Sequence, residues 1–301
     1  MVALTLLTVL TLVFSLVSAS PTPVQARQAI TTLSANQINE FTPYSFFASA
    51  GYCSPSTTIS WTCGAICKAN QGFVPVAAGG DGTDTQFYFV GYDPFLNKVI
   101  VSHQGTDPTQ IENALTDLNF FLTPINSSLF TGVGPIVQVH SGFAAEQALT
   151  APTILAAVKK TMAMFGTGSV TTTGHSLGAA LSLLDALYLR LQLPTASVSF
   201  IGYGLPRVGN PDFADLIDSF LAGSVTHINN KEDPIPILPG EFLGFAHPSG
   251  ENHIMDNNAW VACPGQDNPS TECSTGAVPT IFSGNISDHI GPYNGVTMGV
   301  C

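Results

Sequence analysis

Hydrophobic and polar positions follow two periods along the chain, and each period predicts a type of element. β-Branched and aromatic residues fill 85–93 and 98–105 on either side of the turn-like stretch PFLN, which predicts a β-hairpin. Apolar residues recur at helical spacing in 142–165, 177–193 and 212–221. Short β-rich runs predict strands between these helices, at 168–176, 197–206 and 223–230. Strands that alternate with helices predict an α/β fold, a mostly parallel central sheet with helices on both faces.

The length and composition of the chain favour a single large domain. It has 301 residues, of which 45% are hydrophobic, so it can bury a large core. No repeat or low-complexity linker divides it. We therefore expect one catalytic domain over 33–301, preceded at 20–32 by a Pro-containing pro-segment or surface arm.

The charge of the chain excludes one class of partner. Only 9% of residues are charged, and 8 Lys+Arg against 20 Asp+Glu give a net charge of −12. An acidic surface repels phosphate backbones, so nucleic acid is not an expected partner.

The first 19 residues have the character of a secretory signal. They carry no charged side chain and end in Val-Ser-Ala, with small residues where a signal peptidase cleaves. The alternative is an uncleaved membrane anchor, but no basic stop-transfer flank follows. We expect an exported protein with no transmembrane anchor in its mature form.

Six cysteines in an exported chain predict three disulfides, although six cysteines allow 15 pairings. Cys63 and Cys67 are near enough in sequence for a local loop, as are Cys263 with Cys273, which leaves Cys53 with Cys301. No metal site is expected, because paired CxxC and HExxH patterns are missing from the sequence. Asn126 and Asn285 begin glycosylation sequons, which are typical of exposed loops in exported proteins.

The pentapeptide GHSLG places Ser176 between Gly174 and Gly178. A β-branched run leads into it and a strong helix former leads out, which is the strand-turn-helix context of a nucleophile elbow in an α/β-hydrolase-type sheet. Glycines two residues on either side tolerate the crowding of that turn, and the helix N-terminus faces a developing oxyanion. The plainer alternative is a glycine-lined packing turn.

A serine nucleophile needs a histidine base, and the histidine needs a carboxylate. Asp233 is the favoured acid, because it follows a predicted strand and precedes a proline-rich loop. His247, His253 and His289 all come later in the chain, and their spacing does not choose among them.

Five motifs in order, GHSLGAA, VHSGF, YGLPRVGNPDFAD, NKEDPIPILP and SDHIGPYNG, resemble the fungal class 3 lipases of the Rhizomucor and Thermomyces type. Within that family they resemble the basidiomycete mono- and diacylglycerol lipase branch. The resemblance implies Ser176 as nucleophile, Asp233 as acid and His289 as base. It also implies an oxyanion hole formed by Thr106, in HQGTD, and by the backbone N–H of Leu177.

The resemblance further implies a lid helix from Asp107 to Leu118, with Ile111, Leu115 and Leu118 on its apolar side. The alternative for these residues is an amphipathic surface helix. The segment contains no Trp and alternates polar residues, which favours weak interfacial activation and in part resembles feruloyl esterases. The family's cysteine pattern matches the Cys53–Cys301 and Cys63–Cys67 pairs.

Together these features predict a secreted serine carboxylic ester hydrolase, with lipid esters and the lipid–water interface as its partners. Acylglycerols are the expected substrates, with feruloyl or small carboxylic esters as the alternative. A catalytically silent lipid-binding protein is the third possibility. No cofactor is expected, and we expect a monomer.

Overall fold

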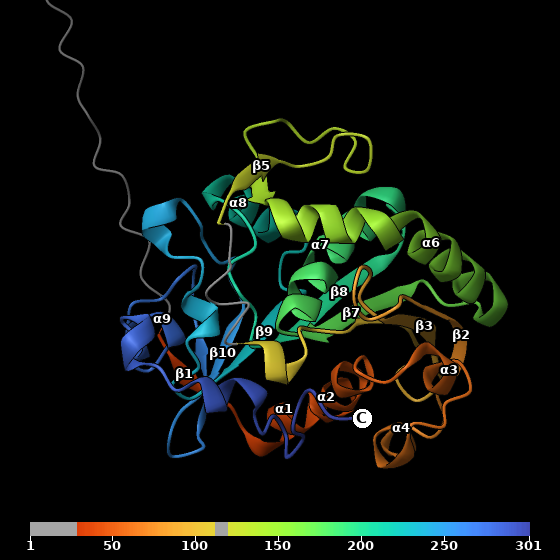
Figure 1. Ribbon diagram of the computed structural model, residues 1–301, viewed down its shortest axis with the longest axis horizontal. Coiled ribbons are helices and arrows are strands. Elements are labelled where there is room, and N and C mark those ends of the chain that lie inside the picture. The colour runs from red at the N-terminus through yellow and green to blue at the C-terminus, as the bar shows by residue number, and fades with distance from the viewer. Residues whose placement is uncertain (1–28, 112–119) are drawn as a thin grey trace, which may run out of the picture.

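The structure is a computed structural model that describes residues 29–111 and 120–301 (Figure 1). The predicted signal and most of the predicted arm lie outside the described residues, as do Leu115 and Leu118 of the predicted lid.

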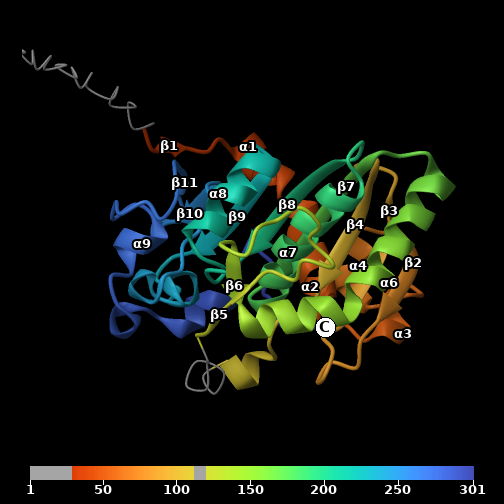
Figure 2. The same cartoon turned by 90° about the horizontal axis from the view of Figure 1, so that it is seen from above.

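The described residues form one nine-stranded sheet, in the order β1-β11-β10-β9-β8-β7-β4-β3-β2. Figure 2 shows these strands side by side across the molecule. A separate two-stranded ribbon pairs β5 with β6. The strand bounds are β1 (Thr31–Thr32), β2 (Val74–Gly79), β3 (Tyr88–Asp93), β4 (Lys98–His103), β5 (Leu122–Pro124), β6 (Gln138–His140), β7 (Ser169–His175), β8 (Ser197–Tyr203), β9 (Val225–Asn230), β10 (Glu251–Ile254) and β11 (Trp260–Cys263).

The centre of the sheet is parallel and its two sides are antiparallel. β4, β7, β8, β9 and β10 pair in parallel, and β7 and β8 run in register from Ser169 opposite Ser197 to His175 opposite Tyr203. The predicted hairpin, β3 with β4, forms one antiparallel side with β2, and β11 with β1 forms the other. The sheet is therefore mixed, with the expected parallel core.

Helices cover both faces of the sheet, as expected. In Figure 1, α6 (Ser141–Phe165), α7 (Leu177–Gln192) and α8 (Pro211–Phe220) lie above it, and α1 (Ala35–Glu40) and α2 (Thr42–Ala50) lie below it. Smaller helices are α3 (Pro55–Thr58), α4 (Gly64–Ala69) and α9 (Ser274–Ala277), with 3-10 turns η1 (Pro108–Gln110), η2 (Ile235–Ile237), η3 (Glu241–Leu243), η4 (Ile281–Ser283) and η5 (Ile286–Ile290).

Successive side chains of a central strand pack into two different hydrophobic cores. Val99 and Val101 of β4 pack into the core shared with α6 and α7, whereas Ile100 between them packs into the core shared with α2. Successive side chains of a strand point to opposite faces, so a central strand covered on both sides is apolar along its whole length.

The three expected cysteine pairs are bonded in the structure. Cys53, just after α2, is joined to Cys301 across 248 residues of sequence, and Cys63–Cys67 and Cys263–Cys273 close local loops. Glu251 lies beside the last pair in the one group of potential metal ligands within the described part of the chain. Both sulfurs of that group are in the disulfide, so they offer no thiolate to an ion.

Two further features of the fold are the pairing of residues 31–32 and the character of the described helices. Thr31 and Thr32, at the end of the predicted arm, pair with β11 and so belong to the sheet. Among the described helices, none combines the length and apolar character needed to cross a bilayer.

Candidate active site

Ser176 occupies a sharp turn between β7 and α7. Its backbone has φ 59° and ψ −129°, a left-handed conformation that strains a residue with a side chain. A Cβ at Gly174 would lie 2.4 Å from the Gly178 carbonyl oxygen, and one at Gly178 would lie 2.4 Å from the His103 carbonyl oxygen. Both positions therefore require glycine, and the structure has the strand-turn-helix that the GHSLG motif predicts.

Asp233 and His289 form a buried pair. Asp233 follows β9 and His289 lies in η5, with 2.8 Å between His289 Nδ1 and Asp233 Oδ2. The side chains of His289 and Asp233 are 0% and 1% exposed. The other carboxylate oxygen of Asp233 accepts a hydrogen bond from the Ile235 backbone N–H. A carboxylate only accepts, so His289 Nδ1 donates and the Nε2 lone pair is free to take a proton.

His289 Nε2 is buried and has no hydrogen-bond partner among the described residues. The structure therefore shows no hydrogen bond between Ser176 and His289 Nε2. Catalytic hydrogen bonds of this kind often tighten only when substrate binds. His289 nonetheless contacts the residue that precedes Ser176. The ring of His175, next to Ser176, lies 4.4 Å from the ring of His289.

A second buried histidine holds the backbone of His289. His175 Nε2 lies 2.7 Å from the His289 carbonyl oxygen, and Tyr52 Oη lies 2.7 Å from His175 Nδ1. Burial, followed by the nearby His289, lowers the pKa of His175 well below its ordinary value, so His175 is neutral at neutral pH. Because the carbonyl only accepts, His175 Nε2 carries the proton and Nδ1 accepts from the Tyr52 hydroxyl.

Tyr52 also connects this network to the turn after β4. The Gly105 backbone hydrogen-bonds the Tyr52 hydroxyl, and a Cβ at Gly105 would lie 2.3 Å from that oxygen. Burial raises the pKa of Tyr52, which keeps the phenol protonated. Tyr52 and His175 thus join the turn that bears Thr106 to the backbone of His289.

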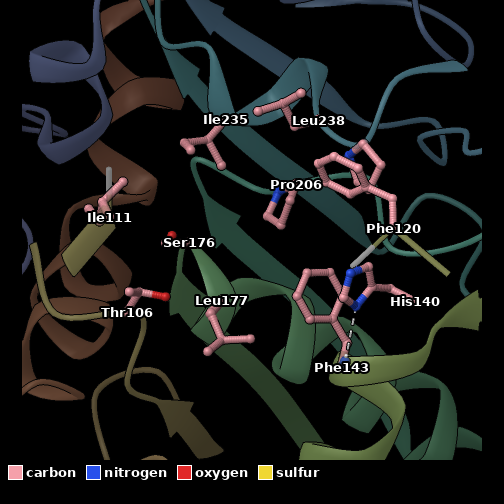
Figure 3. A pocket seen from close by; sticks show the side chains of 11 residues that line it. Thr106, Ile111, Phe120, His140, Phe143, Ser176, Leu177, Pro206, Ile235 and Leu238 are labelled. Atoms are coloured by element: carbon pink, nitrogen blue, oxygen red, sulfur yellow. Dashed lines mark hydrogen bonds between the residues drawn. The ribbon is translucent and has the colours of Figure 1, made fainter. Parts of the chain in front are cut away.

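Thr106, Ser176 and Leu177 meet at one end of a pocket (Figure 3). Thr106 comes from the turn after β4, and Leu177 is the first residue of α7. The backbone N–H groups at a helix N-terminus have no partner within the helix, so the N–H of Leu177 is suited to bind an oxyanion.

The pocket is apolar apart from three side chains. Its empty space, including the part that is open to solvent, is about 480 Å³. Thr106, Ser176 and His140 supply its polar groups, and His140 Nδ1 accepts from the Phe143 backbone N–H, at 3.3 Å. The apolar lining is Ile111, Phe120, Phe143, Leu177, Pro206, Ile235, Leu238 and Pro239.

Several of these lining residues were not singled out by the sequence. His140 and Phe143 lie in VHSGF, Pro206 in YGLPRVGN, and Ile235 and Leu238 in DPIPILP. These three motifs meet at the pocket with GHSLGAA, which bears Ser176 and Leu177. Phe120 carries no sequence signal of its own. Motif positions alone do not show which side chains point inward.

The structure describes the start of the predicted lid. Asp107 caps η1 by accepting from the Thr109 backbone N–H at 2.8 Å, and Ile111 is buried in the pocket lining. The side-chain and backbone hydrogen bonds from Thr109 lower the pKa of Asp107. Ile111 thus lines the pocket, and the remainder of the predicted lid lies outside the described residues.

The two other candidate histidines have different partners. His253 hydrogen-bonds the Glu272 and Lys231 carbonyl oxygens, and His247 bonds the Pro236 carbonyl oxygen. Only His289 of the three pairs with the Asp233 carboxylate within the described structure.

Both sequon asparagines are exposed. The Asn126 side-chain oxygen accepts from the Ser128 backbone N–H, and that of Asn285 accepts from the Ser287 backbone N–H. Each lies in a surface turn, the setting that glycosylation requires.

Comparison with known proteins identifies the family. The family model "Lipase (class 3)" matches residues 100–243. A secreted mono- and diacylglycerol lipase of Gibberella zeae is 32% identical over 73% of this chain and 69% of its own length. One from Malassezia restricta is 30% identical over 65% of this chain, and the match spans 61% of that relative.

Solved structures have the same fold. A triacylglycerol lipase, described as having a serine protease triad at its catalytic centre, superposes with a TM-score of 0.78 and 27% identity, covering 91% of this chain and 100% of that one. The propeptide complex of Rhizomucor miehei lipase gives a TM-score of 0.77 at 25% identity, covering 94% of this chain and 92% of that one. The chain belongs to the class 3 lipase family.

Proposed function

We propose that this protein is a secreted serine carboxylic ester hydrolase that acts on acylglycerols. One observation carries the proposal. The buried His289–Asp233 pair lies beside a strained Ser176 at the wall of an apolar pocket. Ser176 is the nucleophile, His289 the base and Asp233 the group that orients it.

The chemistry follows from these roles. Ser176 Oγ bonds to the ester carbonyl carbon while its proton passes to His289 Nε2. Asp233 holds the Nδ1–H tautomer and stabilises the imidazolium that forms. The alcohol leaves as its C–O bond breaks and takes the proton from His289, which gives an acyl-enzyme. Water repeats these steps and releases the acid.

Thr106 and Leu177 bind the oxyanion of each tetrahedral intermediate. The Leu177 backbone N–H and the Thr106 backbone N–H and hydroxyl are the donors. A single donor of this kind commonly contributes about 3–4 kcal/mol to the transition state. Gly105 and Gly178 support the proposal, because their lack of a Cβ lets the two donor segments approach each other closely.

The pocket lining favours acylglycerols over aryl esters. Apart from Thr106, Ser176 and His140 the lining side chains are apolar, and none of the described residues that line the pocket is a tyrosine. A fatty acyl chain gains about 25 cal/mol per Å² of apolar surface that it buries in such a pocket. The relatives named as mono- and diacylglycerol lipases support the same substrate class.

Exposed phenylalanines around the pocket support a lipid–water interface as the place of action. Phe121 follows the lining residue Phe120, and Phe242 comes three residues after the lining residue Pro239. Phe282 comes two residues before Gly284, where a Cβ would lie 2.7 Å from the Cβ of Pro234, the residue before the lining residue Ile235. The exposures of these three rings are 68%, 90% and 94%, high values for aromatic side chains. Residues 107–118 act as the lid over the pocket.

Secretion is supported by the N-terminal sequence, by the disulfides and by the secreted relatives. Glycosylation at Asn126 and Asn285 fits their exposure. The catalytic domain is residues 33–301, it acts as a monomer, and its chemistry uses no cofactor.

The decisive assay is acid release from an emulsified long-chain diacylglycerol, a soluble short-chain ester and a feruloyl ester. We expect fastest turnover on the emulsion. S176A should fold normally and lose nearly all activity, whereas S60A, a change at an exposed serine, should retain it. Preference for the soluble or feruloyl ester would favour the esterase alternative. Turnover that persists in S176A would reject Ser176 as the nucleophile and with it the proposal. No turnover on any of the three esters would also reject it and leave a silent lipid-binding scaffold.

A further inference from the structure

Arg207 is a large, fully buried side chain that the mechanism does not use. It lies in the YGLPRVGN motif, directly after the pocket residue Pro206, and its side chain is 2% exposed. A buried guanidinium is stable only when its donors are satisfied. Its partners therefore indicate what it does.

Arg207 and His247 bind four consecutive carbonyl groups of the pocket wall. The Arg207 backbone N–H donates to the Leu238 oxygen at 2.8 Å, and its Nη1 donates to the Ile237 oxygen and, at 3.1 Å, to the Pro239 oxygen. His247 Nε2 lies 2.7 Å from the Pro236 oxygen. Leu238 and Pro239 line the pocket, so these bonds fix the backbone from which the lining side chains project.

Asp267 completes the arrangement from a separate loop. Its Oδ1 lies 2.8 Å from Arg207 Nε, and its Oδ2 accepts from the His247 backbone N–H at 2.8 Å. The Cys263–Cys273 disulfide closes the loop that bears Asp267. The loop therefore has a specific partner in the core beneath the pocket.

The surroundings of His247, Asp267 and Arg207 determine which of these side chains are charged. Burial lowers the pKa of His247 to about 3, so the ring is neutral and its Nε2–H donates to the Pro236 carbonyl. Burial alone would raise the pKa of Asp267, but the charged Arg207 guanidinium and the hydrogen bond from the His247 backbone N–H outweigh burial and lower it, so the carboxylate is charged. Arg207 and Asp267 are thus a buried ion pair. Glu241, 54% exposed and 3.4 Å from Arg207 Nη2, adds little.

We propose that Arg207, Asp267 and His247 form a bracket that positions the pocket wall at 236–239 and thereby sets the acyl-chain selectivity of the enzyme. The inference rests on the proposed function, because it assigns the wall to the acyl chain of the ester. These three are positioning residues, since none of them lines the pocket. Displacing a backbone wall by a fraction of an ångström alters the fit of a long chain more than that of a short one.

The test compares selectivity rather than total activity. D267N keeps the shape of the side chain and removes its charge, and R207K keeps the charge and removes the planar fork. For each variant, kcat and KM are measured on esters of one alcohol with butyryl, octanoyl and lauroyl chains. D93N is the matched control, because Asp93 is also a buried carboxylate that caps a backbone turn, between β3 and β4.

We expect both bracket variants to change the lauroyl-to-butyryl ratio of kcat/KM by about tenfold, mainly through KM, with butyryl kcat within about twofold of wild type. D93N should leave the ratio unchanged. The ratio is taken within one preparation, so partial loss of folded enzyme does not alter it. An equal fall on all esters, or an unchanged ratio, in D267N and R207K overturns the proposal. Absence of wild-type activity on every ester would instead refute the proposed function.

Discussion

At the scale of single residues, one hydrogen bond determines how the proposed base works. Buried Asp233 accepts a hydrogen bond from the Nδ1–H of His289, and this leaves Nε2 as the basic atom of the ring. An amide in place of the carboxylate would reverse the tautomer, because an amide N–H can donate to Nδ1.

D233N should therefore fold normally and lose about 10⁴-fold in kcat at neutral pH. D288N changes a carboxylate next to His289 that is not bonded to its ring, and it should stay within a few-fold of wild type. Steady-state rates on a soluble ester are sufficient for the comparison. A D233N enzyme within tenfold of wild type would exclude Asp233 as the acid partner.

The sequence alone identifies some of the proposed catalytic residues and leaves the choice of others open. Ser176 is indicated by its glycines and by the change from strand to helix. The choice of His289 over His247 and His253 depends on which ring reaches the Asp233 carboxylate, and this distance is a tertiary property. The spacing of residues along the chain does not determine this distance, so the choice of His289 rests on the family resemblance.

At the scale of elements, the elbow between β7 and α7 brings Ser176, the proposed nucleophile, against the turn after β4. Gly178 lets the first turn of α7 approach the backbone of His103 and Gln104. A methyl group there would push the helix away from the turn that bears Thr106, and would widen the proposed oxyanion hole.

We expect G178A to lower kcat by at least about tenfold and to destabilise the fold by about 1–3 kcal/mol, as overpacking commonly does. G168A is the matched control, because a Cβ at Gly168 meets nothing within 4 Å. Chemical denaturation and ester turnover test both effects. Equal stability and equal turnover of G178A and G168A would show that neither property needs the close approach of α7 to the turn after β4.

The regular elements in the middle of the chain are predictable and those near its ends are not. α6, α7, β7 and β8 are long and strongly patterned, and they occur where the periodicity predicts them. β10 and β11 have four residues each, and every residue of β10 is buried, so no alternation marks it. α1 has no buried residue, which leaves it without an apolar stripe.

At the scale of the whole molecule, the pocket is assembled from segments far apart in sequence. Ile111, His140, Ser176, Pro206 and Ile235 line one space although the chain between them spans more than 100 residues. The parallel sheet explains part of this, because the strand ends β4, β7, β8 and β9 meet at one edge. The lining from residues 111–143 lies outside the sheet and could not be inferred from its pattern.

The stability of the molecule should depend on acid pH. Burial lowers the pKa of His175, His227 and His247, that of His247 from 6.5 to about 3. The unfolded chain therefore binds more protons than the folded one below pH 6.5, and folding stability falls as the pH falls. For His247 alone the slope is about 1.4 kcal/mol per pH unit between pH 6.5 and about 3. Asp267 acts in the same direction below its ordinary pKa of 3.8.

Denaturant titrations at pH 7.5, 6, 5 and 4 measure this dependence. The unfolding free energy should change little from these groups above pH 6.5 and decline below it. H247Q, whose amide can still donate to the Pro236 carbonyl, should decline less steeply. A constant unfolding free energy from pH 7.5 to 4 would mean that the histidines are not buried and neutral.

The central claim is that Ser176 is the one activated nucleophile of this protein. The most direct test is reaction with a p-nitrophenyl alkylphosphonate, followed by mass spectrometry of the intact protein and its peptides. We predict one phosphonate per molecule, attached to Ser176, with none on S176A and slow labelling of D233N. Labelling of another residue, or no labelling of a folded wild-type protein, would contradict the account.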